Sequence, residues 1–183
     1  MKIIALTGPK TVGKSTIAHQ LVDDCFYPTK IVSFADPIRE MLRTMGVADE
    51  YLTDPNLKET PIPGINQSAR HLMQTLGTEW GRNIINNQIW LWAMDRVVEK
   101  AERSKLSAII IDDCRFENEA DWVHQNGGIV CRVHRDGYEY GSDTHSSEKP
   151  ICLSKIDLHC DGSDKRVTAQ LILDVVDLHM QYL

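Results

Sequence analysis

The feature that most constrains this chain is the segment LTGPKTVGKST, residues 6–16. It contains the spacing G-x-x-x-x-G-K-S, in which Gly8 and Gly13 allow several backbone N–H groups to turn inward around a phosphate. Lys14 can reach the outer phosphates of a bound nucleotide, and the Ser15 hydroxyl can coordinate Mg²⁺. The motif follows a predicted strand and precedes a predicted helix, whose N-terminus adds favourable positive potential.

The composition is typical of a single globular domain over residues 1–183, with 42% hydrophobic and 25% charged residues. The formal net charge of −6 argues against a protein that coats a nucleic-acid polymer, because phosphate neutralisation needs a basic surface. No apolar run approaches the ~20 residues of a membrane span, and the N-terminus is too quickly polar for a signal peptide. We therefore expect no membrane partner and a cytoplasmic location.

The five cysteines are scattered and contain no C-x-x-C pair. They are Cys25, Cys114, Cys131, Cys152 and Cys160. This pattern favours reduced thiols over a disulfide framework or a zinc site.

Short apolar segments alternate with helical patterns along the chain. Strands are predicted at 2–7, 30–34, 108–111, 128–134 and 156–159. Helices are predicted at 14–24, 36–46, 68–83, 87–103 and 116–125, with a closing helix marked by Val167, Leu171, Val175 and Leu178. For the helix over 36–46 we expect Asp36 as N-cap, Pro37 at the first position and Gly46 as the stop. The proline-rich segment 47–66 is predicted to be an irregular connection, and 136–150 a mobile loop.

This alternation predicts an α/β fold with a parallel sheet of about five strands, covered by helices on both faces. Ligands of such sheets bind at the carboxyl ends of the strands. Those ends carry Gly8, Asp36, Asp113 and Arg135, so the chemistry is expected there. The strand AIIIDD also supplies the acidic end, Asp112-Asp113, that a P-loop enzyme needs near its metal. An N-K-x-D segment that would read guanine is absent, which disfavours a GTPase switch.

Several further segments resemble, in this order, those of the phage-type deoxynucleoside monophosphate kinases, which are P-loop kinases. They are FADPIREML, RHLMQTLGTEWGRN, IWLWAMDR, DDCRFENEADWVHQNGGIVCRVHR and DTHSSE. The similarity extends from Met1 to about Pro150. The stretches L-M-Q-x-L-G-T, D-x-R-x-x-x-E and D-T-H-x-S-E are specific in combination. The connection over 47–66 looks shorter than its family equivalent, and the C-terminal segment matches only in outline.

The resemblance implies transfer of the γ-phosphoryl group of ATP, with Mg²⁺, to a deoxynucleoside 5′-monophosphate, giving the diphosphate and ADP. It implies a single P-loop kinase domain with a helical substrate-binding region over 47–104 and a lid-like loop over 136–150. The ATP-binding residues carried over are Lys10, Gly13, Lys14, Ser15 and Thr16, with Ser15 as the metal ligand. A homodimer is an alternative to a monomer.

The resemblance also supplies candidate residues for the monophosphate. They are Thr11, Ile38, Arg39, Arg70, His71, Gly77, Thr78, Trp90, Asp113, Arg115 and Glu119. Three of them depart from the family: Thr11 replaces an expected arginine, Arg39 a lysine, and His71 the second residue of a common Arg-Arg pair. If that arginine grips substrate in relatives, Arg70 or Arg82 takes its place.

Charge compensation is assigned to Lys14, Arg115 and Arg135. Arg115 would hold the acceptor phosphate, while Asp113 and Glu119 contact the sugar or base, or hold Arg115. Arg135, rather than Arg132, would reach the ATP phosphates when the lid closes. The alternative for Arg115 is an ordinary i,i+4 helix pair with Glu119.

Trp90 would stack a base or block a ribose hydroxyl. The alternative for Trp90 is a place in the core. The role of His145 in DTHSSE is left open.

Two other functions remain compatible with the residues. One is a different small-molecule P-loop kinase, similar to those acting on dephospho-coenzyme A. The other is a nucleotide-binding switch without transfer.

Overall fold

The computed structural model describes residues 1–141 and 145–181, without the side chains of 178–181. The chain divides into two compact units. Unit 1 contains Met1–Ser33 and Asp95–Leu183, and unit 2 contains Phe34–Met94. The helical unit therefore begins before the expected 47–104 region and ends inside a helix.

Unit 1 is built on a five-stranded sheet in which every strand pair is parallel, with the order β2-β3-β1-β4-β5. The strands are β1 (Lys2–Thr7), β2 (Thr29–Val32), β3 (Ala108–Ile111), β4 (Ile129–His134) and β5 (Leu158–Asp161). The register pairs Ala5 of β1 with Ile111 of β3, and Thr7 of β1 with Arg132 of β4. The carboxyl ends of these three neighbouring strands therefore meet at one edge. The predicted α/β P-loop fold is confirmed.

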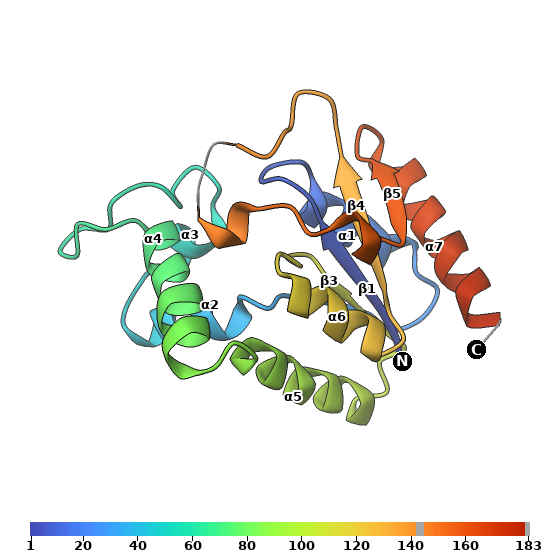
Figure 1. Ribbon diagram of the computed structural model, residues 1–183, viewed down its shortest axis with the longest axis horizontal. Helices are drawn as coiled ribbons and strands as arrows, with labels where there is room; N and C mark the ends of the chain where they lie inside the picture. The colour runs from blue at the N-terminus through green and yellow to red at the C-terminus, as the bar shows by residue number, and fades with distance from the viewer. Residues whose placement is uncertain (142–144, 182–183) are drawn as a thin grey trace. The chain divides into compact units, whose positions relative to one another are not determined.

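Helices cover both faces of this sheet. They are α1 (Lys14–Asp24), α6 (Glu117–Gln125) and α7 (Lys165–Gln181). Unit 1 also contains the second part of α5 (Ile89–Arg103) and the short 3-10 helices η2 (Ser146–Glu148) and η3 (Leu153–Lys155). Helices α1 and α7 pack against each other on one face of the sheet, the right-hand side in Figure 1, and α6 lies on the opposite face. Trp122 of α6 donates its indole N–H to Asp95 Oδ1 at 2.8 Å, which ties α6 to α5.

The main core lies between the sheet and the pair α1 and α7. Ile4 and Leu6 of β1 are fully buried there, and Ile17 and Leu21 of α1 are at most 1% exposed. These side chains form the buried face of α1, and Val22 lies at its margin, half-buried.

The closing helix is present as predicted, but the apolar residues that marked it are not those that α7 buries most deeply. Val167 and Leu171 are 67% and 42% exposed, and Val175 is half-buried; the side chain of Leu178 lies outside the described residues. The sequence of α7 offers two apolar stripes, and the stripe that packs against α1 contains Ala169, Ile172, Leu173 and Val176. The last strand is also displaced, because β5 begins two residues later than expected.

Unit 2 is helical. It contains α2 (Asp36–Thr44), α3 (Asp49–Thr53), α4 (Ala69–Gln74), η1 (Thr75–Ile85) and the first part of α5. The end of α2 is as predicted: Gly46 has φ 93°, its N–H donates to Arg43 O, and Val47 N–H donates to Leu42 O. The N-cap is Ala35 rather than Asp36, and Pro37 lies one position further into the helix.

Two features of unit 2 differ from the expectation. The segment 47–66 is not wholly irregular, because α3 lies within it and buries Leu52. The helix predicted over 68–83 changes geometry midway: α4 continues into η1, a π-helix closed by the bond from Asn86 N to Gly81 O. Such wide turns are rare and occur often at functional sites.

No helix among the residues that the structure describes is long and apolar enough to cross a membrane.

The burial of α7 predicts contrasting effects for two matched substitutions. Val176 is 4% exposed, so Val176→Ala should lower the free energy of unfolding by roughly 1–2 kcal/mol, because two methyl groups leave the core. Val167→Ala removes the same atoms from an exposed position and should change it by less than about 0.5 kcal/mol. Urea denaturation of both variants measures the difference, and equal losses would contradict this orientation of α7.

Candidate functional site

The loop between β1 and α1 has the conformation that its glycines predict. Gly8 and Gly13 have φ values of 142° and 106°, which side chains rarely adopt. A Cβ added to Gly8 would also lie 2.4 Å from Val133 O. Thr11 has φ 62°, unusual for a β-branched residue, and its hydroxyl donates to Lys10 O at 2.6 Å. Lys10 and Thr16 are exposed on either side of the loop's centre.

Lys14 lies inside this loop rather than extending from it. Its ammonium donates to Gly8 O at 2.8 Å and to Pro9 O at 2.7 Å, and the residue is 8% exposed. Burial lowers the pKa of Lys14 to about 8, and the nearby Arg115 guanidinium acts in the same direction. The carboxylates of Asp112, Glu148 and Asp113 oppose this shift. Burial of the charged Lys14 ammonium is unfavourable, so a polyanion that bound beside it would supply a stronger electrostatic partner than the two carbonyl oxygens.

Ser15 is bound to the acidic end of β3. Its hydroxyl donates to Asp112 Oδ2 at 2.9 Å, and the Ser33 hydroxyl donates to Asp112 Oδ1 at 2.6 Å. Both carboxylate oxygens of Asp112 are thereby oriented. Ser33 is not among the site residues predicted from the sequence. Its position as the first polar residue after β2 could have identified it, because the pairing of Val32 with Ile111 sets Ser33 beside Asp112.

Arg115 follows the same strand end, and its guanidinium contacts the segment 145–148. Nη1 donates to Glu148 Oε1 at 3.0 Å and to Ser147 O at 3.2 Å. The side chain of Arg115 is 33% exposed and that of Glu148 only 9%. Glu148 was also not selected from the sequence, because its partner is 33 positions away.

Glu119 holds the backbone of Arg115 rather than its guanidinium. Its Oε2 accepts the N–H of Arg115 at 2.7 Å and of Phe116 at 3.0 Å, which caps the start of α6. Glu119 is 2% exposed. The predicted alternative of a side-chain pair between Arg115 and Glu119 is not what the structure contains. Asp113 is half-buried at the same strand end.

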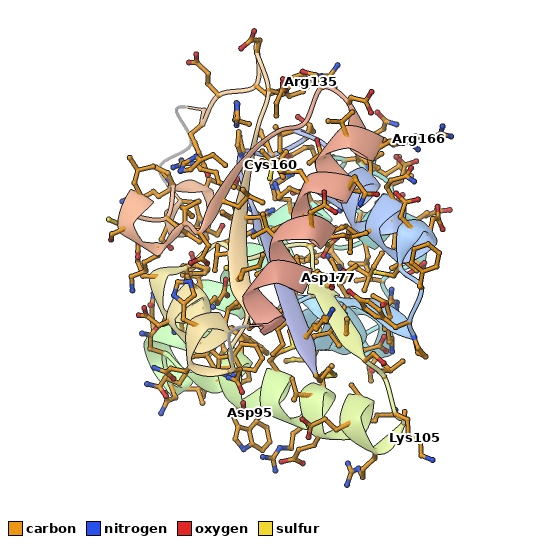
Figure 2. All side chains as sticks on the ribbon, turned by 90° about the vertical axis from the view of Figure 1, so that its right-hand side faces the viewer. Asp95, Lys105, Arg135, Cys160, Arg166 and Asp177 are labelled. Carbon is orange, nitrogen blue, oxygen red and sulfur yellow. The ribbon has the colours of Figure 1, made fainter. Side chains whose placement is uncertain are left out.

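Arg135 lies just beyond β4 and is exposed. Figure 2 shows it at the same end of the sheet as Arg166 at the start of α7, and opposite Lys105, which precedes β3. Its guanidinium lies over the Tyr138 ring, 5.1 Å from the centroid, and that of Arg132 lies over Tyr140 at 5.3 Å. Both arginines are therefore on the carboxyl side of the sheet, each resting on a tyrosine of the following segment.

The expected lid over 136–150 is only partly described, because residues 142–144 lie outside the described residues. The first two residues of DTHSSE are among them. His145 is the N-cap of η2, with Nδ1 accepting the Ser147 N–H at 3.2 Å and lying 2.7 Å from the Ser147 hydroxyl. His145 thus shapes the turn that carries Glu148.

The candidate residues of unit 2 near α2 and α4 are engaged in local pairs. Arg39 donates to Asp36 Oδ1 at 2.6 Å. Arg70 forms an ion pair with Glu59. Arg82 is 6% exposed and donates to Asn87 O at 3.2 Å, while His71 is exposed.

The remaining candidates of unit 2 pack on one another. Trp90 is 5% exposed, and its indole N–H donates to Gly77 O at 2.7 Å. Its ring lies against Gly81, where an added Cβ would be 2.5 Å from Cζ2. Ile38 is buried, and its Cδ1 faces Gly77; Thr78 is half-buried. Trp90 therefore has a packing role, and its contact with a nucleoside stays a prediction.

Comparison with known proteins gives consistent similarities. The sequence model of the family described as "Deoxynucleotide monophosphate kinase" matches residues 64–165. A protein of Acanthamoeba polyphaga mimivirus, named "Putative deoxynucleotide monophosphate kinase", is 31% identical over 163 residues, which is 81% of each chain. The deoxynucleoside-5′-monophosphate kinase of Escherichia phage T5 is 27% identical over 85 residues, which is 44% of this chain and 33% of that protein.

The fold has similarities among solved structures too. The shikimate kinase of Aquifex aeolicus superposes with a TM-score of 0.50 at 14% identity, covering 99% of each chain. At that identity the similarity concerns the fold alone.

The lowered pKa of Lys14 predicts a pH-dependent stability. Below pH 8 the ammonium is charged in both states, so the folded state bears the full cost of its burial. Between pH 8 and the usual value of 10.5, the folded state loses its proton first and the cost disappears. Relative to Lys14→Met, the wild-type free energy of unfolding should therefore rise over this window, by on the order of 3 kcal/mol.

Chemical denaturation at pH 7, 8, 9 and 10 measures this difference. Lys10→Met, on the exposed side of the same loop, is the control and should differ little from wild type at any pH. A wild-type to Lys14→Met difference that does not vary with pH would contradict the buried state of this ammonium.

Proposed function

The chain belongs to the deoxynucleotide monophosphate kinase family, and we propose that it transfers the γ-phosphoryl group of ATP to a deoxynucleoside 5′-monophosphate, giving the diphosphate and ADP. The observation that carries this proposal is the cluster in unit 1. There Lys14, Ser15, Asp112 and Arg115 lie at the carboxyl edge of one parallel sheet. Such edges are the usual position of ligands in this class of fold.

ATP would bind through the loop around Gly8 and Gly13. The open backbone at Gly13, where an added Cβ meets nothing within 4 Å, leaves room for phosphate oxygens next to the start of α1. Lys14 would exchange the carbonyl oxygens of Gly8 and Pro9 for phosphate oxygens. That exchange restores a strong partner to a buried ammonium and raises its pKa again.

Magnesium fits the donor set beside this loop. The Ser15 hydroxyl and the Asp112 carboxylate are hard oxygen ligands of the kind that Mg²⁺ prefers, and Ser33 keeps the carboxylate oriented. No three His, Cys, Asp or Glu side chains form a metal-binding group in the part of the chain that the structure describes. This agrees with a cation held by one or two protein oxygens and by substrate phosphates. When bound, Mg²⁺ would neutralise charge on the phosphates.

The acceptor phosphate is assigned to Arg115. A guanidinium can grip a phosphate through two parallel hydrogen bonds, and the backbone of Arg115 is fixed by the buried Glu119. The acceptor oxygen is already anionic at neutral pH, so the protein need supply no general base. Positioning and charge compensation by Lys14, Arg115 and Arg135 carry the reaction. The guanidinium of Arg135 is exposed and lies over the Tyr138 ring, from which it could move toward the ATP phosphates.

Unit 2 is assigned to the nucleoside. The positively charged side chains of unit 2 that could contact the monophosphate are those of Arg39, Arg70 and Arg82. In the structure each of them interacts with a group of unit 2. The net charge of −6 suits free nucleotides rather than a nucleic-acid polymer as the partner.

The test is a panel of deoxy- and ribonucleoside monophosphates with ATP and Mg²⁺, in which ADP formation is measured. We expect ADP formation that depends on the acceptor, with a higher kcat/KM for deoxynucleotides than for the matching ribonucleotides. Slow ATP hydrolysis that is independent of added monophosphate would contradict the proposal and indicate a nucleotide switch. Equal kcat/KM for dGMP and GMP would contradict the deoxynucleotide assignment.

Lys14→Met should abolish transfer to every acceptor. Loss of one electrostatic stabiliser of the transferring group costs about two to four orders of magnitude in kcat. Far-UV circular dichroism should remain that of the wild type, because the substitution removes a buried charge rather than a core contact. Lys30→Met, at an exposed position of β2 with no assigned role, serves as the control and should retain transfer. A near-normal kcat for Lys14→Met would remove Lys14 from the reaction.

Arg115→Lys should raise the KM for the monophosphate, because an ammonium cannot reproduce two parallel hydrogen bonds. An increase of roughly 30-fold or more corresponds to the 2–5 kcal/mol expected for a desolvated charge contact. The KM for ATP should change little. Steady-state kinetics with each substrate varied, together with thermal melts, decides the matter. An unchanged monophosphate KM would leave the acceptor phosphate to Arg39 or Arg70.

A further inference from the structure

Glu148 is a nearly buried carboxylate next to two cations of the candidate site. Its side chain is 9% exposed, its Oε1 accepts from Arg115 Nη1 at 3.0 Å, and its charge acts on Lys14. A buried carboxylate lowers stability unless it is paired with a cation. Here that cation is Arg115, the residue to which the proposed function assigns the acceptor phosphate. The position of Glu148 therefore bears on how that arginine is presented.

The backbone around Glu148 is well defined by local hydrogen bonds. His145 begins η2 and accepts the Ser147 N–H through Nδ1 at 3.2 Å, and Glu148 N–H donates to His145 O at 3.0 Å. Ser147 O, in the middle of this turn, accepts from Arg115 Nη1 at 3.2 Å. One nitrogen of the guanidinium is thus held by two acceptors from one turn.

The other side of the guanidinium is differently placed. Within residues 1–141 and 145–181, the side-chain hydrogen bonds that the structure gives Arg115 are all made by Nη1. Nε and Nη2 form the opposite edge of the guanidinium, which is the geometry for two parallel hydrogen bonds to an oxyanion. The side chain is also 33% exposed, so a ligand can approach the guanidinium from solvent.

We propose that Glu148 is a positioning residue for the acceptor: it anchors Arg115 at Nη1 so that the Nε–Nη2 edge is held ready for the phosphate of the monophosphate. The proposal rests on the function proposed above for Arg115. Lys14 and Arg115 repel each other, which is why Arg115 lowers the pKa of Lys14. Glu148 offsets that repulsion and keeps the guanidinium near the loop instead of in solvent.

The kinetic test compares Glu148→Gln with Glu139→Gln, an exposed glutamate of the same segment that serves as the matched control. Glu148→Gln keeps the shape but loses the charge, and charge-assisted hydrogen bonds are about twice as strong as neutral ones. We expect the monophosphate KM to rise about tenfold, with the ATP KM within about twofold of wild type. Glu139→Gln should leave both values unchanged.

A double variant shows whether Glu148 acts through Arg115. In the Arg115→Lys background, Glu148→Gln should raise the monophosphate KM by less than about twofold, because the group that it positions is already altered. A full tenfold rise in that background would overturn the proposal. So would an unchanged KM in Glu148→Gln alone. If Glu148→Gln does not fold, Glu148→Asp retains the charge at a shorter reach and should raise the same KM by a smaller factor.

A measurement that needs no activity separates this inference from the proposed function. NMR of the ¹⁵N-labelled guanidinium reports rotation about the Nε–Cζ bond of Arg115 in the protein without substrates. We expect hindered rotation in the wild type and in Glu139→Gln, and averaged Nη signals in Glu148→Gln. Averaged signals in the wild type would overturn the anchoring by Glu148, even if the enzyme transfers phosphate. Hindered rotation in a protein that phosphorylates no monophosphate would support the anchoring and reject the proposed function.

Discussion

The parallel pairing of β1 with both β3 and β4 is the constraint on which the rest of the structure depends. Because Ala5 is level with Ile111 and Thr7 with Arg132, the loop after β1, the acidic end of β3 and the end of β4 reach one edge together. The Ser15 hydroxyl meets Asp112 only because of this register. A shift of one residue in β3 would turn its side chains to the other face and separate these two groups.

The charges at this edge nearly balance without any ligand. Lys14 and Arg115 repel each other, and the carboxylates of Asp112, Asp113 and Glu148 act on Lys14 in the opposite direction. Lys14 is satisfied by carbonyl oxygens, which are weaker partners for a cation than phosphate oxygens. A bound polyphosphate would therefore replace partners that the site already has, instead of entering a site prepared with unpaired charge. Under the proposed function, the loop would favour anions that offer Lys14 more negative charge than the carbonyl oxygens of Gly8 and Pro9 do.

The sequence predicted the interior of unit 1 well and its long-range contacts poorly. The bounds of β1, α1 and β3 agree because each combines a clear apolar pattern with a definite stop. The closing helix was predicted but its buried face could not be, because Val167 and Leu171 make as good an apolar stripe as Ile172 and Val176, and only packing against α1 selects one of them. Ser33 and Glu148 could not be found from spacing, because their partners lie on other strands and turns. The π-helical geometry of η1 has no sequence signal that periodicity detects.

The two units also differ in how far motif matching can identify a site. In unit 1 the matched residues are polar groups with polar partners at a sheet edge, which packing alone does not require. In unit 2 the buried side chains of the matched Ile38 and Trp90 both lie against Gly77, and Gly81 is needed because a Cβ would strike the indole. A family pattern at such positions is explained equally well by packing as by substrate contact. Removal of a buried tryptophan side chain lowers the free energy of unfolding by about 3–5 kcal/mol. A Trp90 variant that loses activity is therefore evidence for contact with the nucleoside only if its free energy of unfolding is that of the wild type.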